Sequence, residues 1–156
     1  MRKEGDFRFL GGSKLCNNTR VQLVEKETDR TRWAAKLVND RHYVLDLNAS
    51  RSCSRDILSA PSCKRNYVDL WTQDDGSGRQ QWYVSRAPVT EQDVNEHHGE
   101  IFYLKITKGR EKCDRNWLSV PNKGPLVDLW SGSGPNQKWL IKGFSTRLMY
   151  DNASSN

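Results

Sequence analysis

The segment YVDLWTQDDGSGRQQWYV, residues 67–84, is largely repeated later in the chain as LVDLWSGSGPNQKWLI, residues 126–141. Both copies contain Val-Asp-Leu-Trp, then a polar loop rich in Gly and Ser, and then Gln-x-Trp. A third, degenerate copy, VQLVEKETDRTRW, occupies residues 21–33 and has the same length as residues 127–139. A spacing that recurs three times in one chain indicates an architecture of three structural repeats.

Short apolar segments divided by Gly, Pro, Ser and Asn surround each copy, a pattern typical of strands and turns rather than helices. Tyr43, Leu45 and Leu47 alternate with other residues, as expected of a strand with one buried face. Such segments number three in the first copy and four in each of the others, and STRLMY, residues 145–150, is predicted to supply a twelfth. The sequence therefore predicts a closed all-β domain with pseudo-threefold symmetry and no free sheet edges.

Three repeats that end in Gln-x-Trp resemble the ricin B-type (R-type) lectins, a family of β-trefoils. The motif occurs as Gln80-Gln81-Trp82 and Gln137-Lys138-Trp139, with Thr31-Arg32-Trp33 as the degenerate copy. The resemblance covers about residues 7–143 and implies a β-trefoil of about twelve short strands in three repeats. We expect one domain over residues 1–156, with repeats at 7–38, 39–87 and 98–143, and a closing strand and tail at 144–156.

The resemblance also implies which aromatic residues are structural. In these lectins the tryptophan of Gln-x-Trp lies in the core, and its glutamine forms local hydrogen bonds that support a loop. The residues expected in these roles are Trp33, Trp82, Trp139, Gln80 and Gln137.

The Val-Asp-Leu-Trp segment carries the candidate binding residues. Alternation along a strand predicts that Val68 and Leu70 point into the core, while Asp69 and Trp71 point outward together. An outward tryptophan is unusual, but a sugar ring can pack its C–H face on an indole while its hydroxyls donate to a carboxylate. The alternative is that these tryptophans cap the core or cover a neighbouring loop.

The three copies differ in how well they match the lectin pattern. That pattern commonly has an Asn before the Gln and an Asp after the second strand, whereas this chain has Arg79 or Asn136, and Ser62 or Asn122. The first copy has no aromatic platform and is predicted to be inactive. The predicted sites are Asn122, Asp128, Trp130 and Asn136 in the third copy, which matches best, and Asp69, Trp71 and Arg79 in the second. Asp74 and Asp75 are interpreted as turn residues rather than as members of the second site.

The four cysteines follow the repeat. Cys53 and Cys113 occupy equivalent places before the second strand of a repeat, while Cys16 and Cys63 follow that strand. Only the second repeat contains both positions, so Cys53–Cys63 is the predicted disulfide, with four free thiols as the alternative.

Composition and charge limit the classes of function. The 156 residues are 35% hydrophobic with a net charge of +6, and no apolar run is long enough to span a membrane. The scattered Lys and Arg residues disfavour a nucleic-acid partner. No leader is visible, so the protein is expected to be cytoplasmic or secreted with its leader removed. No catalytic motif, cofactor motif or metal site is found, and His97-His98 is interpreted as part of a solvated loop.

The predicted function is that of a non-catalytic, lectin-like module that recognises galactose-type or related glycans, or glycoproteins that carry them. Single sites of this kind are weak, so an oligomer would help through avidity. The alternative is a β-trefoil that contacts proteins, as a protease inhibitor, receptor ligand or cytoskeletal binder, through loops 72–79 and 88–99. An anionic polymer or membrane surface is a further alternative, because of the positive charge.

Overall fold

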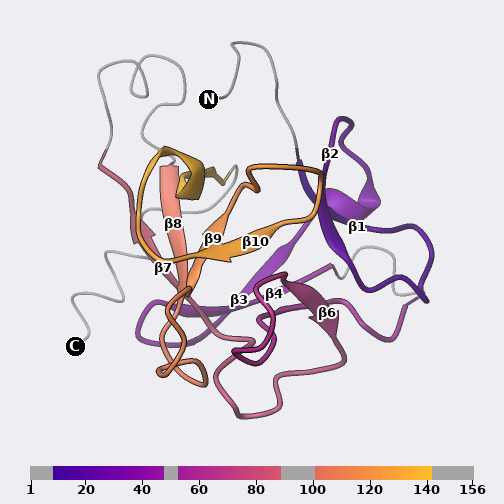
Figure 1. Ribbon diagram of the computed structural model, residues 1–156. Coiled ribbons are helices and arrows are strands. Elements are labelled where there is room, and N and C mark those ends of the chain that lie inside the picture. Colours follow the sequence, from indigo (N-terminus) through magenta and orange to yellow (C-terminus); the bar gives the residue numbers. More distant parts are fainter. Residues whose placement is uncertain (1–8, 48–52, 89–100, 142–156) are drawn as a thin grey trace.

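The computed structural model describes residues 9–47, 53–88 and 101–141, which form short strands and two 3-10 helices (Figure 1). The first repeat contains β1 (Phe9–Gly12), β2 (Val21–Val24), η1 (Asp29–Thr31) and β3 (Ala34–Asn39). The second contains β4 (His42–Asp46), β5 (Ile57–Ser59), β6 (Asp69–Trp71) and β7 (Trp82–Arg86). The third contains β8 (Ile101–Ile106), β9 (Trp117–Ser119), β10 (Asp128–Trp130), η2 (Pro135–Gln137) and β11 (Trp139–Leu140). The described strands thus number three, four and four, as predicted, while the predicted twelfth strand at 145–150 lies outside the described residues.

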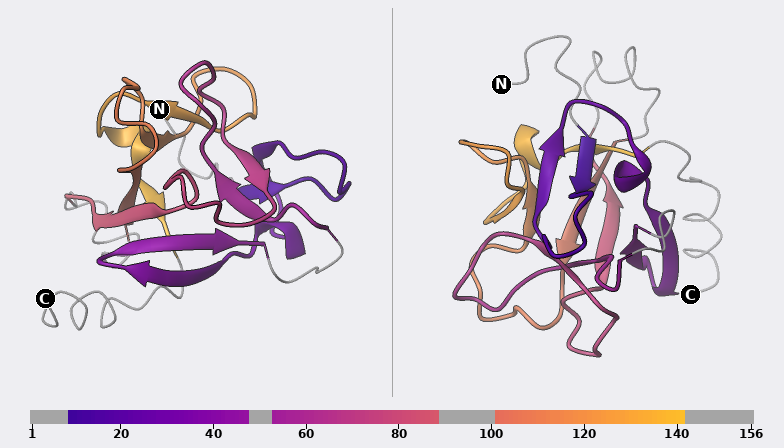
Figure 2. Two further views of the ribbon diagram at one scale, coloured as in Figure 1. Left: turned by 90° about the horizontal axis from the view of Figure 1, so that it is seen from below. Right: turned by 90° about the vertical axis from the view of Figure 1, so that its right-hand side faces the viewer.

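The strands divide into three hairpins and a surrounding wall. The hairpins are the antiparallel pairs β1–β2, β5–β6 and β9–β10, and the wall pairs in the order β3–β4–β7–β8–β11. Figure 2 shows the β1–β2 hairpin from its outer side in the right-hand view and the paired β3 and β4 strands in the left-hand view. This arrangement is a β-trefoil, as the sequence predicts.

The three hairpins meet through backbone hydrogen bonds that repeat from one hairpin to the next. The amide of Val68 donates to the carbonyl of Val127 at 3.2 Å, and the amide of Val127 donates to the carbonyl of Val21 at 3.1 Å. A second set of three equivalent bonds joins Leu23 to Pro125, Leu70 to Thr19 and Leu129 to Asn66, at 2.8, 2.9 and 2.7 Å. The alignment of the three copies on their valines is therefore confirmed in space.

The core lies between these hairpins and the wall, and it includes the predicted tryptophans. Trp82 is 0% exposed, Trp139 is buried, and Trp33 is partly buried against the same cluster. Each indole N–H donates to the carbonyl of a leucine in the first strand of the hairpin of its own repeat, at 2.9–3.0 Å. The acceptors are Leu10, Leu58 and Leu118. Hydrogen-bonding the indole allows these large aromatic side chains to be buried without leaving an unpaired donor.

The two predicted structural glutamines are also confirmed. Gln80 and Gln137 are buried, and their amides donate to the hydroxyls of Ser59 and Ser119, both at 2.8 Å. Each bond joins the loop before the last strand of a repeat to the end of its second strand. The glutamines therefore hold the outer loop against the hairpin.

The first repeat has smaller residues at the positions of the glutamine and the serine. Thr31 replaces the glutamine and Gly11 replaces the serine, and a β-carbon on Gly11 would lie 3.0 Å from Cγ2 of Thr31. Thr31 instead bonds locally in a capping box with Thr28, which begins η1. The degenerate copy keeps the tryptophan but stabilises its loop by a capping box in place of the glutamine–serine bond.

The predicted Cys53–Cys63 disulfide is wrong. The disulfides are Cys16–Cys53 and Cys63–Cys113, with Cα–Cα distances of 5.0 and 5.3 Å. Each joins the loop after the first strand of one repeat's hairpin to the loop before the first strand of the next repeat's hairpin. The pairing follows from contact between neighbouring repeats, whereas the prediction considered partners within one repeat. Both bridges use the same pair of repeat positions.

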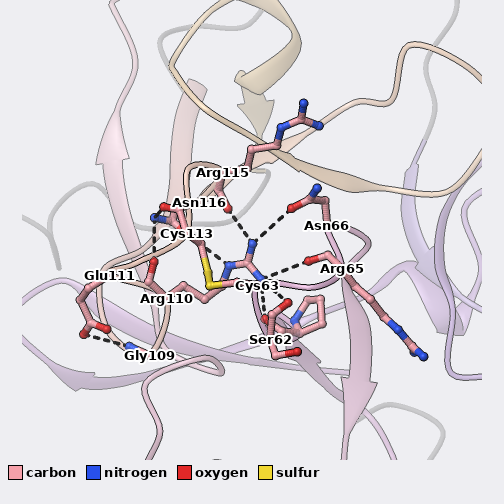
Figure 3. The surroundings of a disulfide bond; sticks show 11 residues. Ser62, Cys63, Arg65, Asn66, Gly109, Arg110, Glu111, Cys113, Arg115 and Asn116 are labelled. Carbon is pink, nitrogen blue, oxygen red and sulfur yellow. Dashed lines mark hydrogen bonds between the residues drawn. A yellow bond between two sulfur atoms is a disulfide. The ribbon is translucent and has the colours of Figure 1, made fainter.

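Arg110 fixes the loops joined by the second disulfide from the inside (Figure 3). Arg110 is 2% exposed, and among the described residues it has no carboxylate partner. Its guanidinium donates to backbone carbonyls of both loops and to two side-chain amides. The acceptors are the carbonyls of Pro61, Ser62, Arg65 and Arg115 and the Oδ1 atoms of Asn66 and Asn116. Without Arg110 these partly buried carbonyls would lose this donor.

Two glycines allow the loop 72–80 to approach the loop that follows β8. Gly78 has φ +91° and Gly109 has φ +85°, a left-handed conformation that side chains rarely adopt. A β-carbon on Gly78 would overlap the side chain of Lys108, and one on Gly109 would lie 2.5 Å from the carbonyl oxygen of Ser77. This close packing sets the position of Arg79 between the two loops.

Candidate functional site

The outer face of the β5–β6 hairpin carries Asp69 and Trp71. In this hairpin Ser59 pairs with Asp69 and Ile57 pairs with Trp71, while Leu70 points into the core. Trp71 is 38% exposed and Asp69 is partly buried. The predicted separation of core and outward residues along this strand is confirmed.

The β9–β10 hairpin repeats this geometry. Asp128 pairs with Ser119 and Trp130 pairs with Trp117, and Trp130 is 37% exposed. The carboxylate and the indole again lie two residues apart on the outward face of the third strand of a repeat. The structure therefore contains two equivalent pairs, which we call the Asp69–Trp71 pair and the Asp128–Trp130 pair.

An arginine lies over each exposed indole, and the sequence reasoning missed both. The guanidinium carbon of Arg55 is 5.6 Å from the ring centroid of Trp71, and that of Arg115 is 4.9 Å from the ring centroid of Trp130. The two arginines occupy equivalent positions, two residues before β5 and two before β9. Their recurrence at one repeat position was the available signal. Each pair, together with its arginine, thus brings a carboxylate acceptor, an aromatic face and a set of N–H donors into one place.

The second copy also has a cavity of about 300 Å³ beside its pair. Its lining residues are Ser59, Ala60, Pro61, Ser62, Lys64, Arg65, Asp69, Trp71, Arg79 and Gln80. The three residues predicted for this copy, Asp69, Trp71 and Arg79, therefore lie around one hollow. Its volume is at the lower end of the range for small-molecule sites and suits one sugar ring.

Arg79 is held at this cavity by the loop that precedes it. Its Nε lies 3.4 Å from the hydroxyl of Ser77, and its guanidinium lies 3.9 Å from the carboxylate of Asp75. Asp75 also accepts from the amide of Ser77 at 2.9 Å, and Asp74 accepts from the amide of Gly76 at 3.1 Å. Both aspartates therefore shape the turn, as the sequence reasoning favoured.

Of the four residues predicted for the third copy, the structure places Asp128 and Trp130 together on the outward face of β10. Asn136 is equivalent to Arg79, since its carbonyl accepts from the amide of Val120 at 2.8 Å as that of Arg79 does from Ala60 at 2.9 Å. Asn122 lies on an exposed bend, and no hydrogen bond joins it to the Asp128–Trp130 pair in the described part of the chain. Its role in this site stays a prediction.

Trp117 is a further aromatic residue of the third copy that the sequence reasoning missed. It lies directly across from Trp130, so the two indoles occupy the same outward face of the hairpin. The Lys105 ammonium is 4.9 Å from its ring centroid, and Tyr103 packs edge-on at 5.6 Å between centroids. The second copy has the buried Ile57 at this position. The third copy therefore offers a wider aromatic surface.

Burial raises the pKa of both outward carboxyl groups. The pKa of Asp69 is raised to about 6, against the opposing effect of Arg79, Arg55 and Arg65. The pKa of Asp128 is also raised to about 6 by burial, and Arg115 opposes this shift. Oδ1 of Asp128 is buried without a hydrogen-bond partner in the described ranges. Such an acceptor is available to a hydroxyl group of a ligand.

The first copy differs at the corresponding place. Its outward residues Gln22 and Val24 offer neither a carboxylate nor an aromatic ring. The side chain of Arg30, which is equivalent to Asn136, is buried and forms an ion pair with Asp56 at 2.7 Å. The prediction that this copy binds no ligand therefore gains a structural reason, since its loop is held by an internal ion pair.

Two further expectations concern metal sites and membranes. In residues 9–47, 53–88 and 101–141, no group of three or more His, Cys, Asp or Glu side chains is arranged to hold a metal ion. The predicted solvated pair His97-His98 lies outside these ranges. Within them, no helix has the length and apolar character needed to cross a membrane.

Solved structures that are similar to the chain include the following two. One is a designed 3-fold symmetric protein, ThreeFoil, with a TM-score of 0.59 and 19% identity over 86% of this chain and 89% of that chain. The other is SeviL bound to asialo-GM1 saccharide, with a TM-score of 0.54 and 12% identity over 88% of this chain and 97% of that chain. At these identities the likeness shows the fold, a β-trefoil. No protein-family model and no curated protein matches the chain.

Proposed function

We propose that this chain is a non-catalytic carbohydrate-binding module. Its sites are the Asp69–Trp71 pair and the Asp128–Trp130 pair, and its ligand is a galactose-type or related glycan. The indole supplies a flat apolar face for one side of the sugar ring, while the carboxylate accepts from hydroxyl groups and the adjacent arginine donates to ring or hydroxyl oxygens.

The proposal rests mainly on the occurrence of an exposed indole beside a partly buried carboxylate at two threefold-related positions. Tryptophan is normally well buried, as Trp82 and Trp139 are here. A carboxylate with a raised pKa and a buried, unpartnered oxygen lowers the stability of the folded state. A ligand whose hydroxyl groups pair with that oxygen accounts for both features at once.

The similarity to SeviL gives independent support. That protein is seen bound to a saccharide, so the β-trefoil scaffold is compatible with sugar binding. Because one fold hosts many functions, the assignment for this chain depends on its own residues. Exposed sites of this kind are weak one at a time, so two sites on one chain favour a multivalent glycan over a single sugar.

Removing the indoles is expected to remove binding. Single-site affinity for galactose is expected in the millimolar range, about 4 kcal/mol of binding free energy. Trp71→Ala and Trp130→Ala should each remove one of the two binding sites per chain. The double variant should show no saturable binding by isothermal titration calorimetry. Leu37→Ala, which changes an exposed apolar residue on β3, is the matched control and should bind as the wild type does. Saturable binding by the double variant would contradict the assignment.

Galactose binding is expected to weaken in acid. The ionised carboxylate is the stronger acceptor, and both carboxyl groups have a pKa of about 6. Protonation therefore leaves only about a tenth of each site ionised near pH 5, and the apparent affinity should fall about tenfold relative to pH 7.5. Calorimetric titrations at the two pH values test this. An unchanged affinity would show that the carboxylates do not act as charged acceptors.

A further inference from the structure

The cavity of the second copy carries an excess of positive charge. Its lining includes three cationic side chains, Lys64, Arg65 and Arg79, and one carboxylate, Asp69. Lys64 and Arg65 are exposed and form no ion pair with any described residue. Within the described ranges Arg79 forms an ion pair with Asp75 at 3.9 Å, and Asp69 lines the same cavity. The opening of the cavity is therefore cationic at neutral pH.

Arg110 adds to this charge from behind two of the lining residues. It is buried and donates to the carbonyls of Pro61 and Ser62. Burial, and after it the charge of Arg79, lowers the pKa of Arg110. No carboxylate of the described part of the chain pairs with Arg110. Its charge is therefore not neutralised locally, and its field extends towards the cavity.

The third copy has fewer of these cations. Counting from the aligned valines, Lys64 corresponds to Lys123, which is also a lysine, but Arg65 corresponds to Gly124. The equivalent carbonyl hydrogen bonds make the neutral Asn136 the counterpart of Arg79. One arginine, Arg115, opposes the raised pKa of Asp128, whereas three arginines oppose that of Asp69. The two sites thus share the carboxylate and the indole but differ in the cations around them.

We propose that the cavity of the second copy binds an acidic sugar, a pyranose whose carboxylate or sulfate ester is held by Lys64, Arg65 and Arg79. The sugar ring packs against Trp71 at the same time. The Asp128–Trp130 pair binds the neutral ring. Arginine donors match the planar or tetrahedral oxygens of such anions in pairs, and charge-assisted bonds are stronger than neutral ones. This inference rests on the proposed carbohydrate binding and gives the second-copy site a preference for an acidic ring over galactose, which both sites bind.

The test compares ligands that share one ring. Galactose, galacturonic acid and galactose 6-sulfate are titrated into the wild-type protein at low salt, with inorganic sulfate as a fourth probe. We expect at least one acidic sugar to bind about tenfold more tightly than galactose, and the two acidic sugars distinguish a carboxylate ligand from a sulfate ligand. Lys64→Gln/Arg65→Gln should lose this preference. Arg32→Gln/Lys36→Gln, which removes two exposed charges elsewhere, should retain it.

Each outcome is decisive. If galactose binds but neither acidic sugar binds more tightly, the acidic-sugar inference is overturned while the proposed carbohydrate binding stands. Inorganic sulfate binding as tightly as galactose 6-sulfate would overturn it too, because the ring would contribute nothing. Retention of the preference by Lys64→Gln/Arg65→Gln would place the anion elsewhere and overturn the assignment. If no sugar binds, the proposed function fails together with the inference.

Discussion

Arg110→Ala is expected to lower the free energy of unfolding by about 3–5 kcal/mol, one of the largest effects of any single substitution in this chain. The guanidinium satisfies four backbone carbonyls in two different loops, through partly buried hydrogen bonds, and alanine would remove the donors of all four. Each unsatisfied buried group costs about 1–3 kcal/mol, and relaxation of the loops recovers part of the total. Denaturant unfolding followed by tryptophan fluorescence measures the loss.

Arg110→Lys is the informative control. Lysine keeps the charge but has three donors in place of five, so an intermediate loss is expected. Arg32→Ala, at an exposed arginine, should change the free energy of unfolding by less than about 0.5 kcal/mol. If Arg110→Ala were as mild as Arg32→Ala, Arg110 would not hold the loops together.

Loss of either disulfide is expected to cost about 4 kcal/mol of unfolding free energy. Cys16–Cys53 spans 37 residues and Cys63–Cys113 spans 50, and closing loops of these lengths restricts the unfolded chain by about that amount. The paired variants Cys16→Ala/Cys53→Ala and Cys63→Ala/Cys113→Ala should both unfold at lower denaturant concentration than the wild type.

Counting free thiols in the denatured protein tests the pairing separately from the stability. Cys63→Ala/Cys113→Ala should have no free thiol, because Cys16–Cys53 remains intact. Cys53→Ala/Cys63→Ala should have two, because it breaks both bridges. Two free thiols in Cys63→Ala/Cys113→Ala would support the Cys53–Cys63 pairing that the sequence predicted and would contradict the observed contact between repeats.

The sequence predicted the fold well because the repeat imposes it. A gapless match of Val21 with Val127 translates directly into equivalent backbone hydrogen bonds, and the shared Gln-x-Trp motif places Trp82 and Trp139 in equivalent core positions. Alternation then separates Leu70 from its outward neighbours without any knowledge of tertiary structure.

The parts that the sequence did not predict depend on contacts between repeats or across strands. The disulfides join neighbouring repeats, so a search within one repeat could not find them. Trp117 becomes part of the third site only through its register with Trp130. The cavity beside Trp71 depends on the conformation of two packed loops, and sequence matching favoured the third copy because its Asn136 fits the lectin pattern.

The tryptophan indole signals of the protein provide the most direct test of the central claim, that the exposed tryptophans bind sugar while the Gln-x-Trp tryptophans are core. The six indole N–H groups give separate peaks in a ¹H–¹⁵N spectrum, and single substitutions assign them. During a galactose titration, the signals of Trp71 and Trp130 should shift in a saturable way. Those of Trp33, Trp82 and Trp139, whose N–H groups are bonded inside the fold, should stay in place. Saturable shifts confined to the core signals, or the absence of any shift at Trp71 and Trp130, would contradict the account.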